Sequence, residues 1–331
     1  MKRNQSESLS RRAMKLLCKL LGVVFVVMLA GTIGFQYLLN QINYAAPDPD
    51  TDAALSVFSP IDLGDLQSSS AHPKIGGTGS GIINILLIGQ DHREGEEGAR
   101  SDSMILCTFN KQTKKLTMTS FLRDLYVEIP GYHSNRINAA YSAGGMQLLE
   151  KTLQHNFGLV IDGAVEVDFT QFSDIIDLLG GVEIELRQDE ANVINQETGS
   201  NLSEGTHKLN GVQALAYSRI RKLDSDGDFS RTSRQRKVIT ALLDSYRSIG
   251  IGDLVPMLTE LLPMITTDLN HGQILMCALE VLPHLKDMAL ASQHIPAPGT
   301  YTDQTIDGMS VLVADMDAAR SALKETLLNH K

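Results

Sequence analysis

From residue 82 onward, short apolar runs alternate with longer segments in which apolar residues recur every three or four positions. Short apolar runs bounded by turn residues are typical of buried strands, and the longer period is typical of helices. Because strands and helices alternate throughout, the pattern predicts one α/β domain over 82–331, with a central sheet covered on both faces. The predicted strands are 82–88, 104–109, 115–120, 126–129, 164–168, 182–186, 291–295 and 310–313. The predicted helices are 146–156, 170–179, 211–221, 231–248, 254–264, 272–285 and 315–328.

Residues 20–39 follow a different pattern, because they are almost wholly apolar and Gln36 is their only strongly polar member. About 20 such residues in a helix rise about 30 Å, the thickness of a bilayer core. This segment is therefore predicted to be a transmembrane helix. A cleaved signal peptide is the alternative, but its apolar region usually has only about 7–15 residues, and Ala45-Ala46 is a poor cleavage site.

The flanks of this span predict its orientation. Residues 1–19 carry six basic residues and one acid, Glu7, which places this tail in the cytoplasm and the rest of the chain outside. Residues 40–81, rich in Pro, Ser and Gly, are typical of a flexible extracellular linker. External placement disfavours nucleic acid as a partner, and anionic membrane lipid explains the basic tail.

A dense basic segment lies at 217–237, although the chain has a formal net charge of -10 at pH 7. Clustered arginines suit bidentate binding of phosphate or pyrophosphate. A helical surface with internal salt bridges is the alternative, because aspartates lie between the two basic groups. We interpret the two groups as reaching one site across a turn, with Arg231 fixing the loop and Lys222, Arg236 and Lys237 as surface charges. The other members are Arg219, Arg221, Asp224, Asp226, Asp228, Arg234 and Gln235.

Acidic and basic residues also occur at the predicted strand ends, where ligands gather in α/β sheets. Mg²⁺ prefers one or two carboxylates together with phosphate oxygens and water, and Mn²⁺ is a further candidate. Asp91 and Asp102 flank neighbouring strands and are predicted to supply these carboxylates beside arginines that stabilise phosphoryl transfer. The alternative for each Arg–Asp pair is a salt bridge that closes a loop. The sequence contains no Walker motif, GxGxxG, HExxH or CxxC pair.

Taken in order, these segments resemble the LytR–CpsA–Psr family of Gram-positive cell-envelope proteins, over about 82–243. Three substitutions depart from the usual family pattern: Phe121-Leu122 where a proline is frequent, Arg136 in place of a common Lys, and Ser103 in place of a Thr. None removes a charge. The matching stretches are NILLIG at 84–89 with Asp91, RSDSMIL at 100–106, RD at 123–124, YVEIP at 126–130, RINAAY at 136–141, GG at 144–145, LGGV at 179–182, LNG at 209–211, ALAYSRIR at 214–221, Arg231, and RQ at 234–235.

The resemblance implies a Mg²⁺-dependent phosphotransferase that moves a glycopolymer, of teichoic acid or capsular polysaccharide type, from an undecaprenyl-pyrophosphate carrier to peptidoglycan. It also implies an α/β/α sandwich with an apolar pocket for the polyprenyl chain, and residues 254–285, rich in Leu and Met, either line that pocket or pack a core. A polyprenyl pyrophosphate phosphohydrolase and a non-catalytic lipid-binding regulator remain open. Carried over by position, the catalytic residues are Arg100, Arg123 and Asp124, the substrate-binding residues are Arg136, Arg219, Arg221, Arg234 and Gln235, and the metal ligands are Asp91 and Asp102.

Overall fold

The computed structural model describes residues 34, 37–45, 81–91, 100–247, 257 and 259–328, with backbone only at 91 and 100. The predicted basic tail at 1–19, nearly all of the predicted membrane span at 20–39 and most of the predicted linker lie outside these residues. In the part that is described, no helix is both long and apolar enough to cross a membrane. The chain divides into two compact units, and the architecture below is that of Asn43–Lys331.

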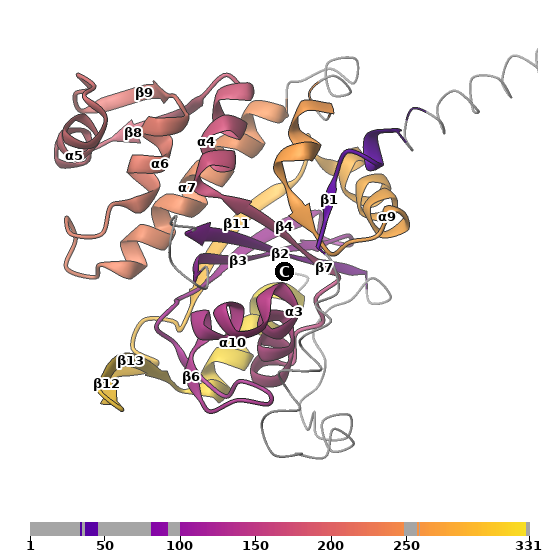
Figure 1. Ribbon diagram of the computed structural model, residues 1–331, viewed down its shortest axis with the longest axis vertical. Coiled ribbons are helices and arrows are strands. Elements are labelled where there is room, and N and C mark those ends of the chain that lie inside the picture. Colours follow the sequence, from indigo (N-terminus) through magenta and orange to yellow (C-terminus); the bar gives the residue numbers. More distant parts are fainter. Residues whose placement is uncertain are drawn as a thin grey trace, which may run out of the picture. The chain divides into compact units, whose positions relative to one another are not determined.

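A mixed sheet runs through the centre of this unit (Figure 1). Within the described residues it has seven strands in the order β1-β10-β7-β2-β3-β4-β11. β2 pairs with β7 in parallel and with β3 in antiparallel orientation, and β4 pairs with β11 in parallel. The prediction of an α/β fold with a central mixed sheet is confirmed. The strands are β1 Asn43–Tyr44, β2 Ile82–Asp91, β3 Arg100–Asn110, β4 Lys115–Phe121, β7 Gly163–Asp168, β10 Thr266–Thr267 and β11 Ala289–Ile295.

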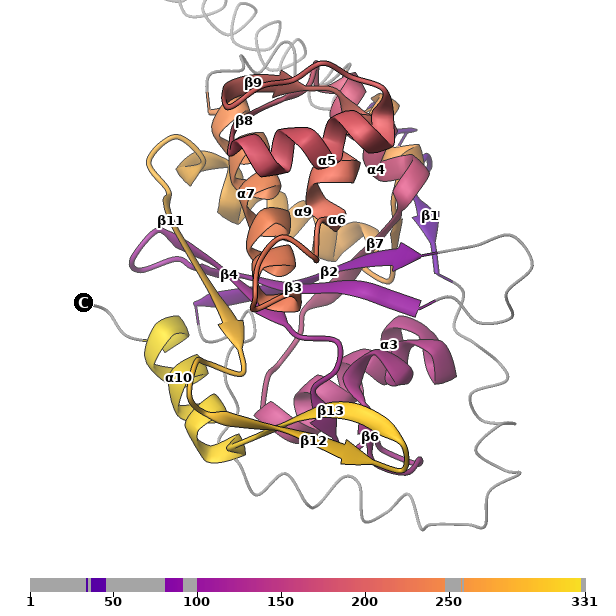
Figure 2. The same ribbon diagram turned by 90° about the vertical axis from the view of Figure 1, so that its left-hand side faces the viewer.

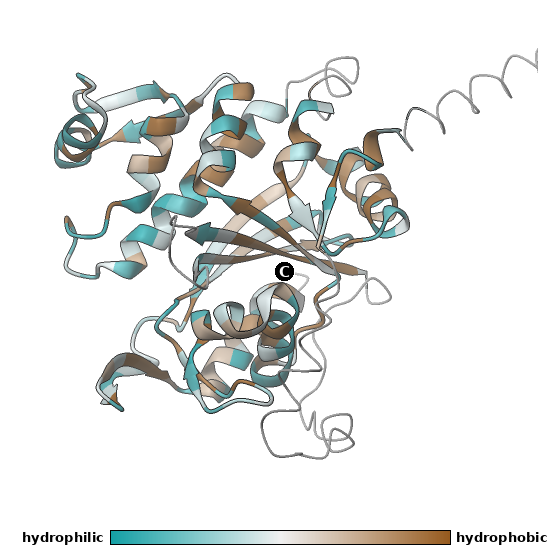
Figure 3. Ribbon diagram, in the orientation of Figure 1, coloured by the Kyte–Doolittle hydropathy of each residue, from teal (hydrophilic) through white to brown (hydrophobic). Residues whose placement is uncertain are grey.

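Helices lie on both faces of the sheet (Figures 1 and 2). On one face, α3 and α10 pack against an apolar cluster that includes Leu86, Met104 and Leu106. On the other face lie α4, α6, α7 and α9, and Figure 3 shows apolar residues along the strands between the two layers. The helices are α3 Ile137–Phe157, α4 Phe169–Leu178, α6 Gly211–Arg219, α7 Asp228–Tyr246, α9 His271–Val281 and α10 Met316–Leu328.

The smaller elements differ most from the sequence prediction. The predicted strand at 182–186 is present as β8, but it forms a separate hairpin with β9 instead of joining the central sheet. α5, β9 and β12 were not predicted, because their polar sequences lack a continuous apolar run. These elements are β5 Tyr126–Val127, β6 Asn135–Arg136, β8 Val182–Leu186, α5 Gln188–Thr198, β9 Gly205–Leu209, η3 Leu262–Met264, η4 Leu282–His284, β12 Tyr301–Ile306 and β13 Met309–Ala314.

α3 begins well before the predicted helix at 146–156, because a second helical piece precedes a kink at Gly144-Gly145. Gly145 has φ 59 and ψ -155, a backbone conformation that essentially only glycine adopts. The segment Ile137–Phe157 is therefore two helical pieces joined at Gly144-Gly145. The first piece carries Tyr141, whose hydroxyl donates a hydrogen bond of 2.6 Å to Glu166 on β7.

Glu150, on α3, makes the stability of the domain depend on pH. Burial, followed by the charge of Asp268, raises the pKa of Glu150 to about 8. Between pH 4.5 and 8 the folded chain retains a proton that the unfolded chain has lost, so this contribution is complete below pH 4.5 and is lost as the pH rises to 8. We expect Glu150→Gln to abolish about 2 kcal/mol of this decline, as measured by urea unfolding from pH 5 to 8.5. Glu197→Gln, at an exposed site on α5, is the control and should keep the wild-type slope.

Candidate active site

Arginines and aspartates from three parts of the chain meet at one end of the sheet. Arg123 Nη1 donates a hydrogen bond of 2.9 Å to Asp102 Oδ1 on β3, and Arg123 Nε lies 3.5 Å from Asp228 Oδ2 on α7. Arg231 Nη2 donates to the same Asp228 oxygen at 3.0 Å and to the backbone carbonyl of Asp102 at 3.1 Å. Together with three flanking residues these form the arginine–aspartate cluster. Its members are Asp102, Arg123, Asp124, Arg136, Arg221, Asp228 and Arg231.

Local structure explains why these side chains converge. β4 ends at Phe121, and Leu125 N then donates to Leu122 O at 3.1 Å, so a tight turn presents Arg123 and Asp124 beyond the sheet. Asp228 is the first residue of α7 and Arg231 follows one turn later, so the two share a helix face. An acidic residue in the first helical turn is also favoured by the helix dipole.

The centre of the cluster is strongly desolvated. The side chain of Arg231 is 5% exposed and that of Asp228 is 12% exposed. Burial lowers the pKa of Arg231 despite the opposing charge of Asp228. Burial would also lower the pKa of Arg123, but the charges of Asp228 and Asp102 outweigh it and raise that pKa above its ordinary value. Arginine is not deprotonated in proteins, so both side chains bring a positive charge to the cluster.

Two buried donors in the cluster have no hydrogen bond within the described residues, namely the Nε atoms of Arg123 and Arg231. Buried polar groups are nearly always paired, so both donors are available to a further acceptor. Arg123 Nε makes only long ion-pair contacts, of 3.5 Å to Asp228 and 3.6 Å to Asp124. Oxygen atoms of an anion would satisfy both arginines at once. This arrangement is able to bind and neutralise a compact oxyanion such as pyrophosphate.

Of three other predicted arginines, two contact the cluster. Arg136 Nε is 3.4 Å from Asp124 and donates to Ser310 O at 3.0 Å. Arg221 Nε is 2.9 Å from Asp228 Oδ1. Arg219 stacks its guanidinium 4.9 Å from the centre of the Phe169 ring. Arg136 and Arg221 thus join the cluster, whereas the contact of Arg219 is with the Phe169 ring.

Arg234 has a different environment from the one its sequence position suggests. It is 3% exposed, and it donates to Glu190 Oε1 at 2.8 Å, to Ile220 O at 3.2 Å and, in a short ion pair, to Asp224. All three of its nitrogen atoms are thereby engaged. The adjacent Gln235 points elsewhere and accepts a hydrogen bond of 3.1 Å from Ser103.

The interpretation of Arg236 as a surface charge is wrong, because Arg236 is buried, with 6% of its surface exposed. Arg231 does more than fix a loop, since it lies at the centre of the cluster. Asp228, interpreted from the sequence as marking the turn, is the carboxylate that three arginines share. The signal that would have found this pair is the spacing of Asp228 and Arg231, three residues apart at a helix start.

An apolar cavity of about 390 Å³ adjoins the cluster. It lies between the sheet and helices α4, α6 and α7. Its lining includes Ser103, next to Asp102 on β3, and Gln235, one helical turn after Arg231 on α7. Of the segment 254–285, rich in Leu and Met, only Leu261 lines it within the described residues. Its apolar lining includes Leu87, Ile105, Val165, Phe172, Leu215 and Ile239.

The metal prediction rests on two carboxylates, of which only one has a described side chain. Asp102 Oδ1 accepts a hydrogen bond from Arg123, while Oδ2 lies 4.0 Å from Arg231 Nη1. For Asp91 and Arg100 the backbone is described, and the two residues pair across β2 and β3. In the described part of the chain, no group of three or more His, Cys, Asp or Glu is arranged to hold a metal ion. One carboxylate fits a Mg²⁺ that takes its other ligands from phosphate and water.

Comparison with known proteins decides the family. The model described as LytR_cpsA_psr family matches residues 63–327. The chain belongs to the LytR–CpsA–Psr family. Over most of its length it is similar to the polyisoprenyl-teichoic acid--peptidoglycan teichoic acid transferase TagT of Bacillus subtilis (strain 168), with 31% identity over 294 residues and 86% of each chain covered. The family predicted from the ordered sequence segments is therefore confirmed.

Solved structures of the family agree with the fold described above. The structure of TagT bound to LIIa-WTA matches with a TM-score of 0.63 and 29% identity, covering 78% of this chain and 94% of that one. The structure of YwtF (TagT) with bound octaprenyl pyrophosphate lipid matches with a TM-score of 0.59 and 27% identity, covering 78% and 95%. Members of the LytR–CpsA–Psr family therefore share the central sheet seen here, and one of them holds a polyprenyl pyrophosphate.

Proposed function

We propose that this protein transfers a glycopolymer from a polyprenyl-pyrophosphate carrier to peptidoglycan. The observation that carries the proposal is the junction of two unlike environments, the arginine–aspartate cluster and the apolar cavity beside it. A polyprenyl pyrophosphate has the same two parts, a dianionic head and a long apolar chain. Ser103 and Gln235 stand where the two environments meet.

In this proposal the pyrophosphate lies against Arg123 and Arg231, whose Nε atoms have no other hydrogen-bond partner in the described region. Arg136, Arg219 and Arg221 surround it, and Gln235 adds a polar contact. Arg234 acts indirectly, because its own bonds to Glu190 and Asp224 fix α7 in place. Bidentate donors in a desolvated site stabilise the negative charge that develops during phosphoryl transfer.

In the proposed transfer step, one P–O bond forms and one P–O bond breaks. A hydroxyl of the acceptor sugar forms a new bond to the phosphorus that carries the glycopolymer, and the bridging P–O bond to the prenyl phosphate breaks. Polyprenyl monophosphate leaves, and the hydroxyl proton passes to a base, for which Asp124 beside Arg123 is the described candidate. When bound, Mg²⁺ would be held by Asp102, together with Asp91, and would neutralise phosphate charge.

Family membership and the sequence together support a proposal for the location. We infer a single-pass membrane protein whose N-terminus is cytoplasmic and whose domain faces the cell wall, where both a lipid carrier and peptidoglycan are within reach. Nucleic acid is not a partner in this proposal. The glycopolymer is of the teichoic acid or capsular polysaccharide type.

The test is transfer in vitro by the purified full-length chain, given a polyprenyl-pyrophosphate-linked glycopolymer, peptidoglycan fragments and Mg²⁺. We expect polymer joined to the fragments and equimolar polyprenyl phosphate. Release of polyprenyl phosphate and polymer phosphate at the same rate without an acceptor would instead identify a phosphohydrolase, and lipid binding without turnover would identify a regulator. Either result would overturn the proposed transfer.

A variant that fills the cavity tests the lipid assignment. Ser218 is buried and lines the apolar cavity, so Ser218→Phe should occupy the space of the prenyl chain. We expect affinity for octaprenyl pyrophosphate to fall about tenfold or more, while affinity for a short-chain prenyl pyrophosphate changes little. Val212→Phe, at a position on the same helix that is 56% exposed, should leave both affinities unchanged. Equal loss for both chain lengths would show that the cavity does not hold the chain.

A further inference from the structure

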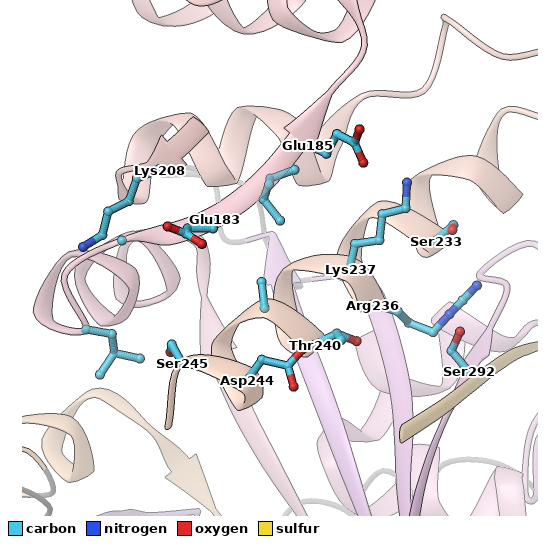
Figure 4. A pocket seen from close by; sticks show the side chains of 14 residues that line it. Glu183, Glu185, Lys208, Ser233, Arg236, Lys237, Thr240, Asp244, Ser245 and Ser292 are labelled. Atoms are coloured by element: carbon cyan, nitrogen blue, oxygen red, sulfur yellow. The ribbon is translucent and has the colours of Figure 1, made fainter. Parts of the chain in front are cut away.

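A second cavity, of about 830 Å³, lies on the opposite side of α7 from the apolar cavity. Successive helix residues are about 100° apart, so Arg236 and Thr240 face away from Gln235 and Ile239. Figure 4 shows the side chains of this cavity, which we call the α7–β8 groove. α7 therefore separates an apolar cavity from a polar groove.

The groove runs along the edge of a strand. Three consecutive residues of β8, Glu183, Ile184 and Glu185, line it. Because successive side chains of a strand point to opposite faces, consecutive lining residues place the groove at the strand's edge. Among the described residues β8 pairs with β9 alone, so its other edge carries unpaired backbone donors and acceptors. Such an edge is able to accept a peptide as an added strand.

A buried positive charge without a carboxylate partner lies on the other side of the groove. Arg236 is 6% exposed, donates a hydrogen bond of 2.7 Å to Ser120, and has a buried Nε without a hydrogen-bond partner in the described region. No ion pair among the described residues includes it, and burial lowers the pKa of Arg236 to about 10. In Figure 4 its guanidinium points toward Ser292 on β11. A buried charge is costly unless it is paired, so this geometry indicates a site for a ligand anion.

The other charged side chains of the groove restrict the chemical class of this ligand. Glu183, Glu185 and Asp244 line the same groove as Lys208 and Lys237. A polyanion would be repelled by three carboxylates, whereas a chain with both carboxylates and ammonium groups would find partners of each sign. The mixed charge and the free strand edge both favour a zwitterionic peptide.

We propose that the α7–β8 groove binds the stem peptide of the peptidoglycan acceptor along the edge of β8, with a peptide carboxylate paired to Arg236. This inference rests on the proposed function, because it assigns a binding site to the peptidoglycan acceptor of that reaction. Arg236 directly follows Gln235 and is bonded to Ser120, three residues before Arg123. A peptide held there would direct the attached sugar toward the arginine–aspartate cluster.

The direct test is titration of an N-acetylmuramoyl tetrapeptide into the full-length protein, without donor or turnover. We expect Arg236→Met to weaken binding about tenfold or more, since it removes a charge-assisted hydrogen bond. The same substitution should raise the stability of the free protein, because it removes an uncompensated buried charge. A purely structural role for Arg236 predicts the opposite stability change. Lys151→Met, at an exposed site on α3, should alter neither quantity.

A second variant tests the same inference in case Arg236→Met does not fold. Thr240→Glu places a carboxylate one helical turn from Arg236, so the two would pair and close the groove to a ligand anion. It should also weaken peptide binding about tenfold or more. Unchanged tetrapeptide binding in both variants, or competition by a glycerol phosphate oligomer in place of the peptide, would overturn the inference. Absence of glycopolymer transfer by a wild-type protein that binds the tetrapeptide would contradict the proposed function alone.

Discussion

Asp228→Asn is expected to reduce glycopolymer transfer by about 10²- to 10³-fold, with kcat falling more than the affinity for donor. Asp228 is shared by Arg123, Arg221 and Arg231, at distances of 3.5, 2.9 and 3.0 Å. Asparagine has the same size but no charge, so the three guanidinium groups would repel one another and lose their common orientation. Steady-state kinetics with the lipid-linked donor measures the effect, and urea unfolding of the same preparation separates it from misfolding.

Asp226→Asn is the matched control for this substitution. Asp226 lies two residues earlier, in the turn before α7, and accepts a hydrogen bond of 2.5 Å from Ser230 at an exposed position. We expect its transfer rate to stay within about twofold of wild type, as is usual for an exposed contact. If Asp228→Asn kept a tenth or more of the wild-type rate, Asp228 would not organise the arginines.

Arg234→Met is expected to lower the free energy of unfolding by about 3 kcal/mol or more. The substitution leaves the buried carboxylate of Glu190 without its 2.8 Å partner and removes the ion pair to Asp224. Breaking a buried ion pair by removing one member is strongly destabilising, because the other charge remains in a medium of low polarity. Urea unfolding of the full-length chain at pH 7 measures the loss.

This experiment also separates the two roles considered for Arg234. A direct pyrophosphate ligand would leave stability nearly unchanged and lose donor affinity, whereas a structural anchor of α7 would show the reverse. Lys237→Met, at an exposed site on the same helix, should change stability by less than about 0.5 kcal/mol. The double variant Arg234→Met with Glu190→Leu should recover part of the loss, because it removes both buried charges.

The central strands and their helices were predictable because their apolar runs are long and regular. The strand at 164–168 and the helix at 211–221 differ from the observed elements only at their ends. The hairpin of β8 and β9 was not assigned correctly, because alternating Val182, Ile184 and Leu186 indicate a half-buried strand without indicating which sheet it joins. The helical piece before Gly145 was not predicted, because the sequence pattern places the start of the helix directly after Gly144-Gly145.

In the site, sequence reasoning identified the residue types better than their partners. Arg123, Asp102 and Arg221 do lie together, as expected from strand-end and basic-cluster positions. Which α7 residues contact the cluster and which contact other parts of the domain was not predictable, because adjacent residues of a helix face different directions. Thus Arg234 faces Glu190 and Gln235 faces Ser103, and no linear motif distinguishes them.

The apolar cavity has a consequence for the folded state itself. Leu87, Ile105 and Val165 stand on the sheet face that helices normally cover, yet here they line an open space. A prenyl chain seated there would supply the missing van der Waals contacts, so the substrate would complete the hydrophobic core of the protein that consumes it. Release of the lipid would then return the domain to a less stable form, so the lifetime of the folded protein would depend on the supply of that lipid.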